Sequence, residues 1–478
     1  MSTKVNISKT ILKSIKVLGS VQMASNICSV ILNKLVALWI GPAGMGMYSI
    51  YNSAVEMLRS ATSLGLRTST VRDVALASES GIGEKLARMV AVVRRWSWFI
   101  SLFGAITTMA LAPALSRWSF GTTDHLWDFV LLSAALLFDG FAYNELSILQ
   151  GLEKLKHYAR ASLLGTVMGL CFSIPLFYWL RLDSILWSVL IYHVSLIAAV
   201  MIYRHRVPEP VKVTNREAVR EGASFVRLGL LMTLSEFVTM LFNYILSAYL
   251  NRVAGTEVVG FYQSGYSLVG RYFGLIFSAL ATEYYPRITR VCHSRMRTRV
   301  FASQEINIMM LCLLPVISIF LVCRELIVSI LYSDEFHAII PYISIAVAGT
   351  VFRAYSCFLA FVIVARGDGK IYILTETLSA LTGFVLNIGC YHLWGLAGLG
   401  IAFCLWYLAY CLIIGAVYFC RYRYTLSTQS SLLTIFTFCF SMGIFALLEA
   451  EWLWTAIAAT AIISVFSFVR LRRLVKGR

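Results

Sequence analysis

Apolar runs of about 20 residues recur along the whole sequence, separated by short connections rich in charge, glycine or proline. A helix of that length crosses roughly 30 Å of hydrocarbon and satisfies its own backbone hydrogen bonds, as a segment in lipid must. Only 14% of the 478 residues are charged, whereas soluble domains carry about 25%. The sequence therefore predicts an all-α, polytopic membrane protein with no separate soluble domain.

The apolar runs predict about 14 transmembrane helices, counted between charged or glycine- and proline-containing connections. Their limits are 17–40, 45–66, 89–113, 126–150, 157–180, 184–203, 225–250, 257–284, 303–332, 338–365, 371–391, 396–420, 430–448 and 452–469.

The distribution of Lys and Arg tests this count. Thirty-three of the 41 basic residues fall at the two ends of the chain, in even-numbered connections or in the span ends beside them. Odd-numbered connections and the span ends beside them hold only Arg117, Arg181, Arg252 and Arg324. Basic residues accumulate in cytoplasmic connections, so both termini are predicted to be cytoplasmic. The N-terminal region has no cleavage site and is predicted to lead into a retained first span.

A weak internal repeat divides the predicted helices. A shift of 214 residues superimposes Lys156 on Lys370 and Tyr158 on Tyr372, each pair at the same point of the topology. We therefore expect two six-helix bundles of parallel topology followed by two extra helices. The predicted domains are 1–206 (first bundle), 207–224 (cytoplasmic linker), 225–423 (second bundle) and 424–478 (helices 13 and 14 with a basic tail).

Several other kinds of partner are disfavoured. The net charge of +17 is broken up by apolar runs and forms no continuous basic stripe, which argues against nucleic acid. The seven His show no HxxxH or HExxH spacing, and the 11 Cys include no CxxC pair. We therefore expect no metal site and no cofactor.

Four basic residues are left inside predicted spans once the connections and the span ends beside them are counted: Lys34, Arg59, Arg271 and Arg353. A charge at mid-bilayer costs at least ~2.5 kcal/mol and should face protein or a water-filled cavity. These four are the predicted substrate-binding residues. Snorkelling is the alternative for Lys34 and Arg271, and an internal ion pair with Glu56 is the alternative for Arg59.

Embedded carboxylates are the candidates for ion coupling, because a buried acid can exchange a proton or help hold Na⁺. They are Asp139, Glu236, Glu56 and Glu145, with Asp139 and Glu236 the strongest. A merely structural pairing with one of the cations is the alternative. The excess of embedded cations favours an anionic passenger such as a diphosphate headgroup, which the planar fork of Arg fits well.

The segment Asn33–Tyr48 resembles the first hairpin of bacterial polysaccharide-unit flippases, the O-antigen and common-antigen translocases of the multidrug/oligosaccharidyl-lipid/polysaccharide exporter superfamily. Four further segments agree, in the same order as in that family: Gly260–Gln263, Tyr285–Ile288, Leu331–Phe336 and Ala365–Gly367. Together they extend the resemblance over most of the chain.

This resemblance implies a V-shaped pair of six-helix bundles that works by alternating access. It implies that an undecaprenyl-diphosphate-linked oligosaccharide moves from the cytoplasmic to the periplasmic leaflet of the bacterial inner membrane, coupled to a proton or Na⁺. It also implies cooperation with polysaccharide polymerase and chain-length proteins. Cavity-lining basic residues of the family correspond by position and type to Lys34, Arg59, Arg271 and Arg353.

Three other functions compete. A multidrug or cation antiporter of the same superfamily would be expected to have a cavity richer in carboxylates. A polysaccharide polymerase or ligase would need a nucleophile–base set, usually on a long external loop, and neither is present. A purely structural membrane protein does not explain charges kept inside both halves. The sequence therefore favours a transporter over an enzyme.

Overall fold

The computed structural model describes residues 23–79, 83–205, 211, 213–423 and 427–476. Within these ranges every regular element is an α-helix or a short 3-10 or π turn, and no strand occurs. Eight helical stretches of the described residues are long and apolar enough to cross a membrane. The predicted all-helical, multi-pass class is confirmed, whereas the number 14 and the cytoplasmic termini stay predictions.

The chain folds as two compact units, residues Met1–Val259 and Gly260–Arg478. The first unit begins with a helix over Met23–Trp39. Its other helices are α2 (Gly41–Thr62), α3 (Leu66–Glu79), α4 (Gly83–Phe120), α5 (Leu126–Gly151), α6 (Leu155–Leu180), α7 (Ser184–Ile202) and α8 (Asn215–Ala254), with a 3-10 turn η1 at Arg181–Asp183. Helix α9 (Thr256–Tyr266) contains the boundary between the units.

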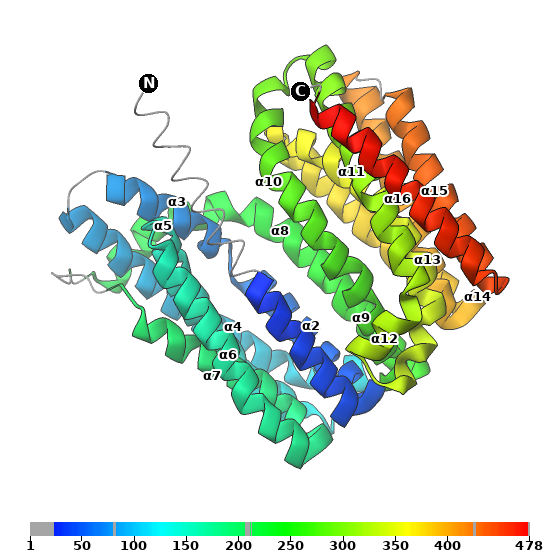
Figure 1. Cartoon of the computed structure of the whole chain (residues 1–478). Helices are drawn as coiled ribbons and strands as arrows, with labels where there is room; N and C mark the ends of the chain where they lie inside the picture. Colours follow the sequence, from blue (N-terminus) through cyan, green and yellow to red (C-terminus); the bar gives the residue numbers. More distant parts are fainter. Residues whose placement is uncertain (1–22, 80–82, 206–210, 212, 424–426, 477–478) are drawn as a thin grey trace. The chain divides into compact units, whose positions relative to one another are not determined.

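The second unit continues with a π turn, η2 (Ser267–Tyr272), and then α10 (Phe273–Val291), α11 (Arg295–Val322), α12 (Arg324–Leu331), the 3-10 turn η3 (Asp334–Ile339), α13 (Ile340–Ala365), α14 (Gly369–Val417), the π turn η4 (Tyr418–Tyr422), α15 (Thr428–Glu449) and α16 (Leu453–Lys476). Figure 1 shows α11, α15 and α16 side by side, and α11 packs against both of the other two.

Most predicted runs coincide with a helix to within a few residues. The runs 126–150, 157–180 and 184–203 correspond to α5, α6 and α7. The first run, 17–40, begins outside the described residues. One difference is informative: α3 lies in a segment taken as a connection. The predicted break between runs 371–391 and 396–420 coincides with Gly395 (φ 59°, ψ −139°), where two helices meet at a kink within α14.

Helix α8 belongs to the first unit because its beginning is fixed on α4. Thr214 and Glu217 form a capping box at the start of α8, and these hydrogen bonds lower the pKa of Glu217. One turn on, Glu221 accepts from Arg88 at 2.7 Å, and the Trp96 indole donates to the Ala218 carbonyl at 2.8 Å. The two-bundle division with a linker at 207–224 stays a prediction.

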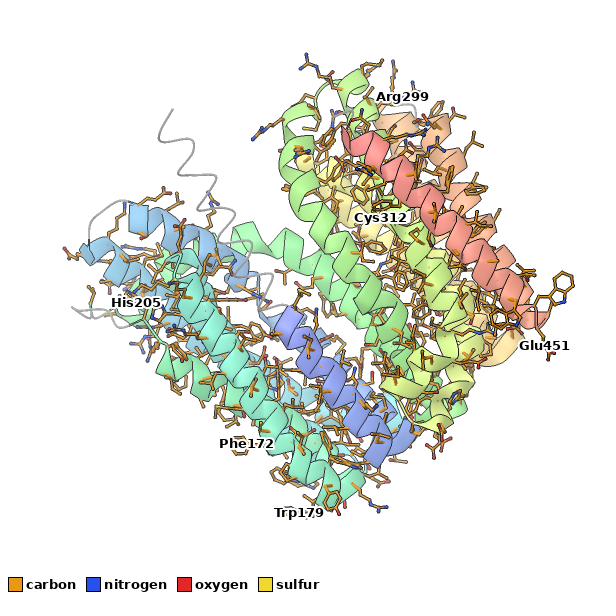
Figure 2. All side chains as sticks on the ribbon, viewed as in Figure 1. Phe172, Trp179, His205, Arg299, Cys312 and Glu451 are labelled. Carbon is orange, nitrogen blue, oxygen red and sulfur yellow. The ribbon has the colours of Figure 1, made fainter. Side chains whose placement is uncertain are left out.

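Apolar side chains also cover the outside of the helices, as lipid requires. On α6, Phe172 is 53% exposed and Trp179 is 77% exposed, and Figure 2 shows both pointing away from the ribbon. Inside the first unit, Tyr51, Phe129 and Tyr244 are almost completely buried in one apolar cluster. Large apolar groups therefore lie both inside the unit and on its outer surface, which is typical of membrane spans rather than soluble bundles.

Candidate functional site

A polar cavity of about 110 Å³ lies within the first unit, where α2 ends and α3 begins. Leu64 and Gly65 between these helices have positive φ values of 48° and 71°, so the chain turns sharply there. This turn brings Arg59 from α2 and Arg67 from α3 to the same cavity. At about 30 Å³ per water molecule, the volume suits a few waters or a compact anionic group.

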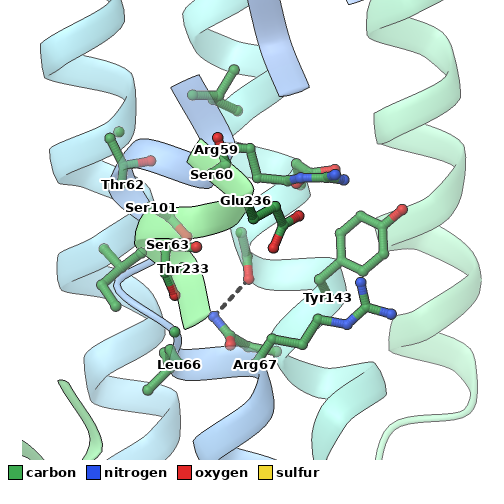
Figure 3. A pocket seen from close by; sticks show the side chains of 17 residues that line it. Arg59, Ser60, Thr62, Ser63, Leu66, Arg67, Ser101, Tyr143, Thr233 and Glu236 are labelled. Atoms are coloured by element: carbon green, nitrogen blue, oxygen red, sulfur yellow. Dashed lines mark hydrogen bonds between the residues drawn. The ribbon is translucent and has the colours of Figure 1, made fainter. Parts of the chain in front are cut away.

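Two arginines of the cavity share one aromatic ring. The guanidinium carbon of Arg59 lies 5.3 Å from the Tyr143 ring centroid, and that of Arg67 lies 4.9 Å from it. Figure 3 shows the Tyr143 ring between the two guanidinium groups. Among the described residues, no carboxylate oxygen lies within 4 Å of either guanidinium. Both forks therefore keep hydrogen-bond donors for a ligand.

The cavity also contains two of the predicted carboxylates. Asp139 is 2% exposed, and its Oδ1 lies 3.3 Å from Nε2 of His193, which comes from α7. Glu236 lines the cavity from α8 and is exposed to it. The charge of Arg59 interacts with Asp139, Glu236 and Glu56, although none forms a close pair with it. The site is therefore close to neutral overall, with two cations and two carboxylates.

The remaining predicted residues of the first unit lie elsewhere. Lys34 is half-buried in the first helix, and it is not among the residues lining the cavity. Glu56 lies one turn before Arg59 on α2, also outside the lining. The ion pair of Glu56 with Arg59, which was the alternative for that arginine, does not form within 4 Å.

Glu145 forms a separate cluster near the ends of α4 and α7. Its Oε1 accepts from Nε of Arg94 at 2.6 Å and from Nε of Arg204 at 3.0 Å, and its Oε2 accepts from Arg94 at 3.0 Å. Arg94 also donates to the His205 carbonyl at 2.8 Å. Burial, and then the nearby Lys154, lower the pKa of His205. The buried Glu145 carboxylate therefore holds two partly exposed arginines.

Arg353 lies in the second unit, on α13. Its Nη1 donates to the Gly270 carbonyl of the π turn η2 at 2.9 Å, and its guanidinium carbon lies 5.6 Å from both the Phe277 and Tyr407 rings. A π turn leaves the helical hydrogen-bond ladder out of register, so Arg353 braces this turn. The backbone of Arg271 is part of η2, but its side chain lies outside the described residues.

The structure adds three residues that the sequence did not indicate: Arg67, Tyr143 and His193. The sequence places Arg67 among the basic residues of a cytoplasmic connection. Hydropathy does not indicate the turn at Leu64–Gly65 that brings Arg67 back to the cavity. A Tyr or His in an apolar run is most often a buried core residue. Among the described residues, no group of three or more His, Cys, Asp or Glu is placed to hold a metal ion.

Solved structures of membrane transporters have a similar all-helical fold. An inward-facing multidrug resistance MATE family transporter of the MOP superfamily matches with a TM-score of 0.69 at 15% identity, over 86% of this chain and 95% of that one. The lipid II flippase MurJ, in an inward closed conformation, matches with a TM-score of 0.69 at 13% identity, over 96% and 99%.

A MOP superfamily transporter from Pyrococcus furiosus, described for the reversed polarity of its binding pocket, matches with a TM-score of 0.60 at 16% identity, over 88% of this chain and 96% of that one. No curated protein sequence matches the chain. The family model described as "Polysaccharide biosynthesis protein" matches residues 35–341, more than half of the chain. The chain belongs to this polysaccharide biosynthesis family and has the MOP transporter fold.

Proposed function

We propose that this protein is a flippase for a lipid-linked oligosaccharide, moving an undecaprenyl-diphosphate-linked unit from the cytoplasmic to the periplasmic leaflet of a bacterial inner membrane. The observation that carries the proposal is the pair of guanidiniums, Arg59 and Arg67, on either side of Tyr143. Each guanidinium can offer two parallel donors to a phosphate, so the pair suits the two phosphates of a diphosphate. Membership in a polysaccharide biosynthesis family supports a sugar-bearing passenger.

The cavity is too small for an oligosaccharide, so it would hold the headgroup alone. The prenyl tail would remain in lipid, and the sugars would occupy space that opens during alternating access. Lys34, Arg271 and Arg353 remain proposed contacts for other parts of the passenger. Proton or Na⁺ coupling through Asp139 or Glu236, with Glu56 and Glu145 as weaker candidates, is part of the same proposal.

The proposal is tested in cells that lack the protein, by identifying the lipid-linked intermediate that accumulates. Wild-type protein should clear this intermediate, whereas Arg59→Ala and Arg67→Ala should slow clearance by at least tenfold with normal membrane insertion. The matched control is Arg117→Ala, which removes an exposed arginine at the far end of α4. Clearance by both cavity variants at the wild-type rate would contradict the proposal.

A cation antiporter is the second candidate, because Glu236 presents a carboxylate to the same cavity. Asp139 is less available to a passenger, since it is 2% exposed and faces His193. An antiporter would lower the cellular content of an organic cation such as ethidium, and Glu236→Gln would abolish this effect. A flippase would leave the ethidium content unchanged and alter only the lipid-linked intermediates.

A further inference from the structure

Asp139 and His193 place a carboxylate and an imidazole together at the midpoints of two spans. Asp139 is in the middle of α5 and His193 in the middle of α7. Their side chains are 2% and 7% exposed, and Oδ1 lies 3.3 Å from Nε2. The pair is therefore shielded from bulk water on most sides, and Asp139 borders the cavity.

The tautomer of His193 is fixed by its backbone contact. Nδ1 lies 2.8 Å from the Val189 carbonyl oxygen, which can only accept a hydrogen bond, so Nδ1 carries a proton. Nε2 is then the only ring nitrogen at which the proton content can change. The pair is neutral overall when one proton lies between Nε2 and Oδ1, and it has a charge of −1 when that proton leaves.

The other carboxylate oxygen of Asp139 has an unsatisfied hydrogen-bonding capacity. Oδ2 of Asp139 is buried, and no described residue donates a hydrogen bond to it. Around the pair, the charged and titratable groups are as follows: Arg59 and Glu56 on α2, Arg67 on α3, Tyr143 on α5, Tyr192 on α7 and Glu236 on α8. The described parts of α4 and α6 add no charged group to the cavity lining.

The role of the Asp139–His193 pair follows from the balance of charges around the cavity. Without a ligand, the two arginines offset Asp139 and Glu236. A diphosphate adds at least two negative charges to the same small space, and the carboxylate of Asp139 would then repel it. A proton taken up at Nε2 converts His193 to an imidazolium beside that carboxylate and removes the repulsion.

We propose that the Asp139–His193 pair takes up one proton when a phosphate-bearing ligand binds between Arg59 and Arg67. This proposal rests on the proposed function, because it needs an anion at the arginines. Only a proton moves: an O–H bond of hydronium breaks, the Nε2–H bond forms, and no other bond changes. Na⁺ is disfavoured here because the imidazole nitrogen occupies the position next to Oδ1, and hard cations prefer oxygen ligands.

The test uses full-length protein in detergent with inorganic pyrophosphate as the probe. Binding is measured by calorimetry, and proton uptake by a pH indicator in weak buffer at pH 7. For each pyrophosphate bound, wild-type protein should take up more protons than Asp139→Asn. The difference should be a large fraction of one proton. His193→Gln should lose the same uptake while still binding. Asp124→Asn, which neutralises an exposed carboxylate in the same unit, should behave as wild type.

Between pH 8 and pH 6, the affinity ratio of wild type to Asp139→Asn should rise, by at most tenfold per pH unit for one linked proton. Equal proton uptake by wild type, Asp139→Asn and His193→Gln would overturn the pair as the proton site, and so would loss of uptake in Glu236→Gln alone. Pyrophosphate binding that survives the double change Arg59→Ala and Arg67→Ala, or no binding by wild type, would instead overturn the proposed headgroup site.

Discussion

Tyr143 stands between two positive charges that would otherwise repel each other. Both guanidinium carbons lie within 5.3 Å of its ring centroid, and each cation–π contact is worth about 0.5–2 kcal/mol. The ring therefore holds the two guanidinium groups at a fixed separation. Unlike a salt bridge, it does not neutralise their charges. This arrangement keeps the arginines positioned and still able to bind an anion.

The ring, rather than the hydroxyl, should matter for this role. We predict that Tyr143→Phe retains transport, whereas Tyr143→Leu loses the aromatic face and lowers transport by about tenfold, corresponding to about 1.4 kcal/mol. Clearance of the lipid-linked intermediate at matched protein levels measures both. Equal activity of the Phe and Leu variants would show that the ring does not position the arginines.

Glu145 should behave differently from the cavity carboxylates, because it is 7% exposed and holds two arginines. The arginine side chains are 23% and 39% exposed, so solvent compensates part of the lost charge, and Glu145→Gln should cost about 1–3 kcal/mol of stability. Thermal unfolding in detergent measures this loss. Exposed Glu153 at the end of the same helix supplies the control, and Glu153→Gln should leave the unfolding midpoint unchanged.

Sequence reasoning found part of the cavity. The cost of burying charge singled out Arg59, Asp139 and Glu236, and the structure brings these three to one site. The same reasoning grouped them with Arg353, which braces a π turn in the other unit. Charge in an apolar run shows that a residue needs a partner or a cavity, but tertiary packing decides which one.

Helices α6 and α7 approach closely at a glycine. A Cβ added at Gly165 would lie 2.8 Å from the Leu196 Cα, and a backbone atom cannot move aside cheaply. Gly165→Ala should therefore separate this helix pair and lower the unfolding midpoint, by an amount corresponding to about 1–3 kcal/mol. Gly389→Ala in α14 is the matched change, since nothing lies within 4 Å of the added methyl. It should be neutral or slightly stabilising; similar losses in both variants would contradict the packing argument.

The positions of the long helices were predictable because lipid imposes a length and an apolar composition on each span. Helix α3 had no such signal. It is polar enough to be taken for a connection, and its mostly polar sequence contains Arg67, Arg72 and Asp73. The break in α14 at Gly395, with its positive φ of 59°, does fall between the predicted runs 371–391 and 396–420.

The predicted topology places Glu451 and Arg473 on opposite sides of the membrane. Arg324, predicted to be external, forms an ion pair with Glu449 at 2.9 Å, which puts the start of α12 and the end of α15 at the same end of the second unit. Glu451, labelled in Figure 2, follows directly and should therefore be external too. Arg473, in the basic tail, should be cytoplasmic.

Cysteine labelling tests this orientation. With the exposed Cys171, Cys420 and Cys439 changed to Ser, a membrane-impermeant maleimide should label Glu451→Cys in intact cells. It should label Arg473→Cys only after the cells are permeabilised. The reverse pattern would invert the predicted topology, and labelling of both in intact cells would mean that the number of spans between them is even.

The central claim is that Arg59 and Arg67 hold the diphosphate of a lipid-linked oligosaccharide, and mass spectrometry of membrane lipids tests it most directly. Cells lacking the protein are compared with cells that carry wild type or the double variant Arg59→Ala, Arg67→Ala. We predict that a prenyl-diphosphate-linked oligosaccharide accumulates without the protein and with the double variant, and disappears with wild type. Full clearance by the double variant, or no such lipid in cells lacking the protein, would contradict the claim.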